Sequence, residues 1–285
     1  MKYIVTGGAG FIGSHLVDAL LADGHDVRIL DNLTSGSRLN VNPRATLLEC
    51  DIRVYESIAP HFEGVDGVFH LAAIARTPWC IDDPILAYTT NVMGTLHVLE
   101  AARQHGIKRI VMTSSNVVHA FMTPYRSSKQ ALEDLGEVYT KMYGLSVLCL
   151  RNSNVYGSRQ SESGPSPNVF SALRKSKREK GHLVITGDGT QTRDFTHVSD
   201  IVRAHILAMS SSVTGVIDLC TGIQRSLNEV ATYFGCPIVY SDERAGDVKH
   251  IIQDPEPAHK LLGWTARMSF DEGMRDFFQD PVLSA

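Results

Sequence analysis

The chain carries the glycine-rich turn Gly7-Gly8-Ala9-Gly10-Phe11-Ile12-Gly13 between an apolar run, Tyr3–Thr6, and a stretch of helical period, Phe11–Ala22. Such a glycine pattern is informative only where it joins a strand to a helix, as it does here. Gly7 permits the tight turn, Gly10 lets a pyrophosphate approach the backbone, and Gly13 lets helix and strand pack closely. The helix N-terminus adds amide donors and a partial positive charge. The turn therefore predicts a dinucleotide-binding site.

Short apolar runs alternate with longer stretches of helical period along the first half of the chain. The expected strands are Tyr3–Thr6, Val27–Leu30, Thr46–Cys50, Gly67–Leu71, Arg109–Thr113 and Ser146–Leu150, and the expected helices are Phe11–Ala22, Ile85–His105 and Ser127–Tyr143. In the last helix, Leu132, Leu135, Val138 and Met142 form an apolar stripe. Strands that are apolar on both faces are typical of a parallel sheet covered by helices. The predicted fold class is therefore α/β, a Rossmann-type doubly wound parallel sheet.

The pattern changes after about residue 155. The stretch from Gly157 to Asn168 is rich in Ser, Gly and Pro and is expected to be a loop, and the basic run Arg174-Lys175-Ser176-Lys177-Arg178 is expected to be a solvated helix end. We predict a cofactor domain over residues 1–155, with segments near 190–222 returning to it. Residues 156–285 are expected to form mainly a smaller α/β substrate-binding lobe.

Composition excludes several classes of protein. The 285 residues are 43% hydrophobic and 20% charged, with a net charge of −4, which gives no reason to expect a nucleic-acid or membrane partner. No apolar run approaches the roughly 20 residues that span a bilayer. The five cysteines have no metal-ligand spacing, so we expect free thiols and no metal. Met1 leads directly into the first apolar run, so we expect no cleaved leader and a cytoplasmic protein.

Asp31 ends the second expected strand, about 20 residues after the glycine turn. A carboxylate at this place can accept hydrogen bonds from both hydroxyl groups of an adenosine ribose. It would repel a phosphate on that ribose, so the sequence favours NAD over NADP.

These segments resemble the extended short-chain dehydrogenase/reductases, and within them the NAD-dependent nucleotide-sugar epimerases and dehydratases, the UDP-hexose 4-epimerases above all. The resemblance runs nearly end to end and includes Thr6–Leu16, Asp31-Asn32-Leu33, Asp51-Ile52, His70-Leu71-Ala72-Ala73 and Asn91–Thr95. It implies that Asp51 and Ile52 border the adenine and that Ala72 and Ala73 line the cofactor cleft. The full set of cofactor-binding residues that it implies is Gly7, Gly10, Phe11, Ile12, Gly13, Asp31, Asn32, Asp51, Ile52, Leu71, Ala72, Ala73, Asn91, Tyr125 and Lys129.

Tyr125 and Lys129 are four residues apart at the start of an expected helix and so share one face. A phenol is a poor base at its ordinary pKa of about 10, but a nearby ammonium and a positive nicotinamide ring would lower that pKa. Tyr125 is therefore the expected catalytic base. Ser115 matches the family serine that bonds the reacting hydroxyl, although Ser114 is an alternative.

Later segments resemble the nucleotide-sugar-binding parts of the family. Planar guanidinium groups match phosphate oxygens, which suits two arginines converging on a diphosphate. Asp247 would accept from the uridine ribose, and the family asparagine at Asn154 contacts the diphosphate. The expected substrate-binding residues are Ser115, Asn116, Asn154, Arg193, Arg244 and Asp247.

The stretch Ser115-Asn116-Val117-Val118-His119 contains no carboxylate, whereas 4,6-dehydratases and related decarboxylases usually carry one there. This favours a UDP-hexose 4-epimerase that oxidises a sugar to a 4-keto form and returns the hydride. A dehydratase, a reductase, another epimerase and a non-catalytic NAD sensor remain alternatives.

Departures from the family pattern fall near the sugar. His119 replaces the usual tyrosine and is either a structural histidine or a proton donor, and Asn152-Ser153 replaces an aromatic pair. Only three residues separate Ala120 from Pro124, where relatives carry a longer loop. The sequence therefore does not identify the sugar or its nucleotide. The resemblance also implies a homodimer, paired through the Ile85–His105 and Ser127–Tyr143 helices.

Overall fold

A seven-stranded, fully parallel sheet forms the centre of the computed structural model, which describes residues 1–160, 168–242 and 249–279. The strand order is β10-β6-β5-β4-β1-β2-β3. The strands are β1 Lys2–Thr6, β2 Asp26–Asp31, β3 Thr46–Glu49, β4 Gly67–His70, β5 Arg109–Ser115, β6 Ser146–Asn152 and β10 Gly215–Leu219. The order reverses at β1, as in a doubly wound sheet, so the predicted fold class is confirmed.

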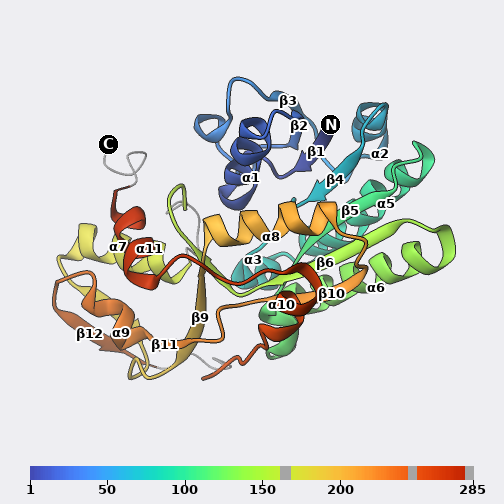
Figure 1. Cartoon of the computed structure of the whole chain (residues 1–285). Helices are drawn as coiled ribbons and strands as arrows, with labels where there is room; N and C mark the ends of the chain where they lie inside the picture. Colours follow the sequence, from blue (N-terminus) through green and yellow to red (C-terminus); the bar gives the residue numbers. More distant parts are fainter. Residues whose placement is uncertain (161–167, 243–248, 280–285) are drawn as a thin grey trace.

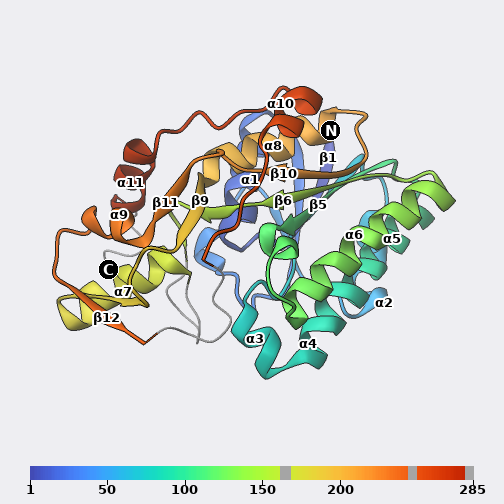
Figure 2. The same ribbon diagram turned by 90° about the horizontal axis from the view of Figure 1, so that it is seen from below.

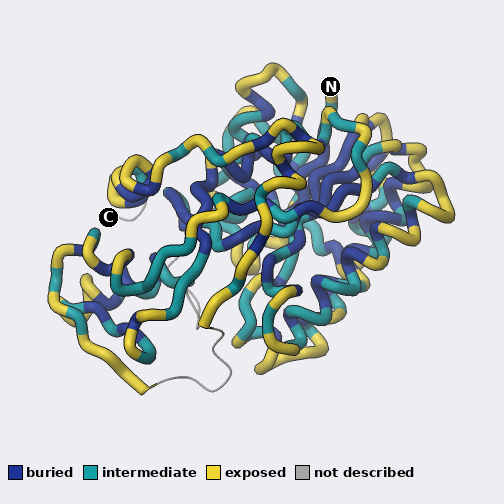
Figure 3. The backbone as a smooth tube through the Cα atoms, turned by 60° about the horizontal axis from the view of Figure 1, so that its bottom comes forward, coloured by how far each residue is buried: buried dark blue, intermediate teal, exposed yellow. Residues whose placement is uncertain are grey.

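Helices cover both faces of the sheet (Figure 1), whose strands are largely buried (Figure 3). Strands β1 to β6 contribute apolar side chains to a buried layer on each face, whereas β10 contributes to one layer only. On β1, Val5 packs with helices α1 (Phe11–Ala22) and α8 (Val198–Ser210), whereas Ile4 packs with α5 (Gly94–Gln104) and α6 (Pro124–Tyr143) on the other face. Both side chains are fully buried. The short α2 (Tyr55–Ile58) also covers the second face. Because both faces are covered, the strands read as continuous apolar runs in the sequence.

A second, smaller set of elements gathers at one end of the sheet (Figure 1). It comprises β7 Asn154–Tyr156, β8 Leu183–Thr186, β9 Thr192–His197, β11 Gln224–Ser226, β12 Ile238–Ser241, α7 Val169–Lys180, α9 Leu227–Thr232 and α11 Phe270–Phe278. These strands form a three-stranded sheet, β11-β9-β7, and a two-stranded sheet, β12-β8. Tyr156, Phe170, Phe195 and Phe277 form an aromatic core of their own between the helices and these sheets.

Helix boundaries differ from the sequence prediction in two places. The segment expected as one helix, Ile85–His105, is α4 (Pro84–Tyr88), a π-helical turn η3 (Thr89–Met93) and α5. Helix α6 begins at Pro124, three residues earlier than expected, because the Thr123 hydroxyl accepts from the backbone amide of Arg126 and proline suits the first helical position.

The remaining elements are short and connect the larger ones. They are η1 Arg38–Asn40, η2 Ala59–Phe62, α3 Thr77–Asp82, η4 Asn116–His119 and α10 Glu256–Leu262. All five cysteines are free thiols, as expected. Within the described ranges, no helix is both long and apolar enough to cross a membrane.

Candidate active site

A cavity of about 1300 Å³ opens along the carboxyl ends of β1, β2, β4, β5 and β6 and reaches β7 and α7. This is the edge of a doubly wound sheet at which ligands bind. One end is lined by the glycine turn and Asp31, and the other by Ser115, Tyr125 and Lys129. The predicted cofactor and catalytic centres therefore share one cavity.

The glycine turn is built so that no side chain fits within it. A Cβ atom on Gly13 would lie 2.1 Å from the carbonyl oxygen of Gly7, and one on Gly7, whose φ is +70°, would lie 2.8 Å from the amide nitrogen of Ala72. Helix α1 begins after Gly10 with no side-chain cap and no acidic residue in its first turn. Its first amides therefore face the cavity without a competing protein anion, which suits a pyrophosphate.

Asp31 lies at the end of β2 and is held in place by two backbone amides. Its carboxylate accepts from Ala9 N at 2.9 Å and from Leu33 N at 2.8 Å. Burial raises the pKa of Asp31, and these two hydrogen bonds oppose the rise. Each carboxylate oxygen can accept more than one hydrogen bond, so both remain available to a ribose diol. The residues present therefore fit NAD.

His70, which the sequence shows only as part of a family segment, is buried and joins the strand ends behind the glycine turn. His70 Nδ1 lies 2.7 Å from Thr6 Oγ1, and His70 Nε2 lies 2.9 Å from Thr95 Oγ1. Since Thr95 already donates to the carbonyl oxygen of Asn91, its oxygen accepts from His70. Burial lowers the pKa of His70 to about 3, so the ring is neutral and structural. Only tertiary packing identifies it.

The predicted trio converges at the far end of the cavity. Ser115 ends β5, and its hydroxyl hydrogen-bonds the phenol of Tyr125. Tyr125 and Lys129 lie one turn apart on the first part of α6, and Lys129 Nζ donates to the carbonyl oxygen of Thr113 at 2.8 Å. All three line the cavity, although Tyr125 is 9% and Lys129 3% exposed.

Burial dominates the protonation of this trio. It raises the pKa of Tyr125 to about 12, and the hydrogen bond from Ser115 and the Arg76 guanidinium only partly oppose the rise. Burial also lowers the pKa of Lys129 to about 8. The prediction that the lysine brings the phenol towards neutrality is therefore not met by the protein alone. Arg76, which also lines the cavity, was not predicted from the sequence.

Ser114 belongs to a different interaction. Its hydroxyl donates at 2.5 Å to the buried carboxylate of Glu133, which also receives two hydrogen bonds from Arg151, at 2.7 and 2.8 Å. Glu133 is 3% exposed and lies one helical turn after Lys129. The geometry thus favours Ser115 over Ser114 as the partner of Tyr125. The four-residue spacing from Lys129 to Glu133 was the available signal for the missed carboxylate.

Most of the predicted cofactor residues line the cavity, and two do not. The Asp51 carboxylate instead accepts hydrogen bonds from Arg53 and from the side-chain amide of Asn32. The hydrogen bond from Arg53 lowers the pKa of Asp51 to about 2. Asn91 is fully buried and bonds the backbone of Ile74 and the hydroxyl of Ser128. It fixes the wall of the site beside Tyr125 instead of facing the cavity. The residues that do line it are Gly7, Gly10, Phe11, Ile12, Gly13, Asp31, Asn32, Ile52, Leu71, Ala72, Ala73, Tyr125 and Lys129.

The predicted substrate residues fall into three groups. Ser115, Asn116 and Asn154 line the cavity. Arg193 does not; its guanidinium donates to the carbonyl oxygens of Thr192 and Lys249. Arg244 and Asp247 lie outside the described residues.

His119 also stays out of the large cavity. Its Nε2 lies 3.3 Å from the carboxylate of Asp218 on β10, which favours the structural interpretation over a proton donor.

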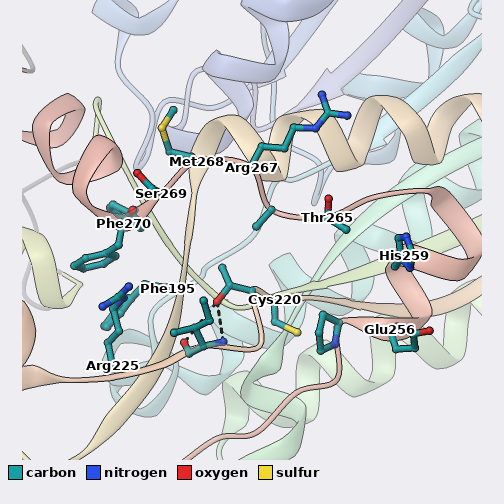
Figure 4. A pocket seen from close by; sticks show the side chains of 15 residues that line it. Phe195, Cys220, Arg225, Glu256, His259, Thr265, Arg267, Met268, Ser269 and Phe270 are labelled. Carbon is teal, nitrogen blue, oxygen red and sulfur yellow. Dashed lines mark hydrogen bonds between the residues drawn. The ribbon is translucent and has the colours of Figure 1, made fainter.

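A second cavity, of about 500 Å³, lies between the β9–β11 sheet and the segment that leads into α11 (Figure 4). Its walls include Phe195, Arg225 and Phe270, and the Arg225 guanidinium lies 4.4 Å from the centre of the Phe270 ring. None of the predicted catalytic or cofactor residues lines it. The reaction is therefore assigned to the larger cavity.

Comparisons with known proteins agree with this geometry. The model of the NAD dependent epimerase/dehydratase family matches residues 3–219. A putative UDP-glucose 4-epimerase of Methanocaldococcus jannaschii is 34% identical over 296 residues, which cover 95% of each chain.

Two solved structures are similar throughout. The UDP-glucose 4-epimerase of Thermotoga maritima, solved with UDP-glucose, has a TM-score of 0.93 and 32% identity, with 97% of each chain covered. The Thermus thermophilus UDP-glucose 4-epimerase in complex with NAD has a TM-score of 0.89 and 32% identity, with the same coverage.

Proposed function

The chain belongs to the NAD-dependent epimerase/dehydratase family, and we propose that within it the protein is a UDP-hexose 4-epimerase. NAD is its cofactor. The relatives and solved structures most similar to it over their whole length act on or bind UDP-sugars, which supports a nucleotide sugar as the substrate.

NAD supplies a hydride acceptor that can return the hydride, and a positive ring that favours a nearby phenolate. The residues of this chain supply the proton chemistry. Tyr125 takes the proton from the hydroxyl at the sugar's reacting carbon, and Ser115 holds that hydroxyl in line through its own hydrogen bond. Lys129 lies one helical turn from Tyr125, and the Arg76 guanidinium partly opposes the rise that burial causes in the pKa of the phenol. On the return step Tyr125 donates the proton back.

One observation favours epimerisation over dehydration. Asp31 is the only carboxylate among the described residues that line the cavity, and it lies at the adenosine end. Elimination of water from a sugar needs an added acid and base next to the ring. Asn116, which lies beside Ser115, is an amide and supplies no proton at physiological pH. The cavity therefore supports oxidation and return at one carbon.

The test uses the purified chain incubated separately with UDP-glucose, UDP-galactose, and their N-acetyl and uronic forms, with no added NAD. We expect interconversion of 4-epimers, detected by proton NMR of the sugar. Net loss of water, or a requirement for added NADPH, would replace the epimerase with the dehydratase or reductase alternative. Absence of turnover with NAD bound would favour the sensor alternative.

The same function includes a homodimer as a further proposal. Ile85 on α4 and Val138 and Met142 on α6 are exposed apolar side chains, and α4 packs against α6 (Figure 2). Met142 is 72% exposed, which is unusual for a group whose burial is favourable. We expect a dimeric mass by light scattering and a monomeric mass for Met142→Asp. A monomeric wild type would refute the proposal.

Two coarser assignments complete the proposal. Residues 1–155, with segments near 190–222 returning to them, would form the domain that holds NAD, and residues 156–285 would form mainly the lobe that holds the nucleotide sugar. Five free thiols are consistent with the reducing cytoplasm. Asn116 and Asn154 would contact the substrate directly, and Arg193, Arg244 and Asp247 remain predicted partners of its UDP group.

A further inference from the structure

Asn152 ends β6 and lines the large cavity, yet no described group satisfies its side chain. It is 4% exposed, and neither the amide nitrogen nor the amide oxygen has a hydrogen-bond partner among the described residues. Buried amides are normally paired, so an unpaired one calls for an explanation.

The residues on both sides of Asn152 are firmly held. Arg151 forms two hydrogen bonds with Glu133, and its carbonyl oxygen accepts from Gln253 Nε2 at 3.3 Å. Ser153 donates its backbone amide to the carbonyl oxygen of Leu219 at 2.9 Å, and its hydroxyl lies 2.7 Å from Thr196 Oγ1. The backbone on both sides of Asn152 is therefore fixed.

The register of the sheet places Asn152 at the reaction end of the cavity. Asn152 pairs with Ser115 on the neighbouring strand β5, and adjacent strands lie about 4.8 Å apart. Ser115 bonds the proposed base, Tyr125. Along the sheet edge, Asn152 lies one strand beyond Ser115, on the side of β7 and the smaller lobe.

We propose that Asn152 is a ligand-binding residue that orients the reacting groups. An asparagine amide offers two donors and an acceptor, so its complement is a ligand group that both donates and accepts. Two such groups meet at this place in a reaction between NAD and a sugar: a ring hydroxyl of the hexose and the carboxamide of nicotinamide. This inference rests on the proposed function and adds to it a residue that neither the glycine turn nor the trio contains.

The test measures four affinities for the full chain and for Asn152→Leu, which keeps the size of the side chain and removes its polarity. NAD and ADP-ribose differ by the nicotinamide, and they are titrated into chain freed of nucleotide. UDP-glucose and UDP differ by the hexose, and they are titrated into chain loaded with NAD. Each pair isolates one candidate partner of Asn152.

If the hexose is the partner, Asn152→Leu lowers the affinity for UDP-glucose by about 10-fold and leaves the affinity for UDP unchanged. If nicotinamide is the partner, the variant lowers the affinity for NAD by about 10-fold and leaves the affinity for ADP-ribose unchanged. Four unchanged affinities overturn the proposal, and so does equal weakening within both pairs, because that pattern reports a distorted site. These readouts need no turnover, so a failure of the epimerase proposal is seen separately in the sugar assay.

A matched control variant and a measurement of stability test whether a loss of affinity comes only from a damaged fold. Ser171 on α7 also has a buried hydroxyl with no partner in the described part of the chain, but it does not line the cavity. Ser171→Ala should leave all four affinities unchanged. The melting temperature of ligand-free Asn152→Leu should not fall, because an apolar group replaces an unsatisfied amide. Should that variant fail to fold, Asn152→Ser gives the same four comparisons with a smaller side chain.

Discussion

The two ends of the large cavity are built differently. At the cofactor end, Asp31 is fixed by backbone amides and the glycines are packed against the backbone of Gly7 and Ala72. At the reaction end, the buried amide of Asn152 has no hydrogen-bond partner among the described residues, and a hydrogen bond from Ser115 acts on the Tyr125 phenol. The polar groups of the cofactor end have their protein partners before a ligand binds, whereas those of the reaction end gain partners when the ligand binds.

This difference assigns cofactor affinity to one end of the cavity and the reaction itself to the other. A rigid, prebuilt cofactor end can hold NAD through many turnovers, as an enzyme that returns its hydride requires. A reaction end with unsatisfied polar groups gains its interactions as the reacting groups are brought together. Changes at the two ends should therefore affect different measurements.

The largest effect should come from Tyr125→Phe. Removing the hydroxyl removes the proposed base while the ring continues to fill its buried place, so turnover should fall by about 10³-fold or more. The amount of NAD released by acid from the purified variant should stay near the wild-type value. Turnover close to wild type would show that another group is the base.

Gly13→Ala should break the cofactor end. The added Cβ would lie 2.1 Å from the Gly7 carbonyl oxygen, so the turn must move by more than a soft contact allows. We expect NAD affinity to fall by about 100-fold, measured by calorimetry, because the amides no longer converge on the pyrophosphate. Gly24→Ala is the control, since a Cβ there meets nothing within 4 Å, although its φ of +78° lowers stability slightly. Unchanged NAD binding in Gly13→Ala would contradict the role of the turn.

The neighbouring serines offer a matched pair at the reaction end. Ser115→Ala should lower turnover roughly 10- to 100-fold, because it removes the partner of the phenol. It should cost less stability than Ser114→Ala, because the other hydrogen bond it removes, from Val117 N, is long at 3.3 Å. Ser114→Ala should instead reduce the free energy of unfolding by about 1–2 kcal/mol, because it removes a hydrogen bond to a buried carboxylate. Steady-state kinetics and urea unfolding distinguish the two. The reverse assignment of effects would make Ser114 the catalytic serine.

The smallest effect concerns Lys129 and pH. The folded chain releases the Lys129 proton near pH 8, whereas an unfolded lysine holds it to about pH 10.5. Between these values the unfolded state binds more protons, so this group makes stability rise with pH. From pH 7.5 to 9.5, the wild type should gain roughly 2 kcal/mol relative to Lys129→Met in urea unfolding. If the free energies of unfolding of the wild type and of Lys129→Met change with pH in the same way, the Lys129 ammonium is not desolvated.

The glycine turn and Asp31 could be recognised in the sequence because their signals are local. A glycine turn between a strand and a helix, followed by Asp31, needs only a few consecutive residues to be recognised. The apolar runs also predicted six of the seven strands of the main sheet. The seventh, β10, is a short run that includes Asp218 and pairs with β6, more than 60 residues earlier in the chain.

The reaction end depends on contacts between distant segments. Nothing near Asn152 in the sequence indicates that its amide is buried and unpaired, since that follows from the register of β5 against β6. Asn91 matched a cofactor motif but turns away to bond Ile74 and Ser128. The pKa of Tyr125 was expected to fall beside Lys129 and a bound nicotinamide, whereas in the chain alone burial raises it more than the hydrogen bond from Ser115 and the Arg76 guanidinium lower it.

The central claim is that the hydride leaves C4 of the sugar and returns to the same carbon. The most direct measurement incubates the purified chain with UDP-glucose deuterated at C4 and follows the product by NMR and mass spectrometry. We predict UDP-galactose that retains its deuterium at C4, with no NAD added. Loss of the deuterium to solvent, its transfer to another carbon, or a product lighter by one water would contradict the claim.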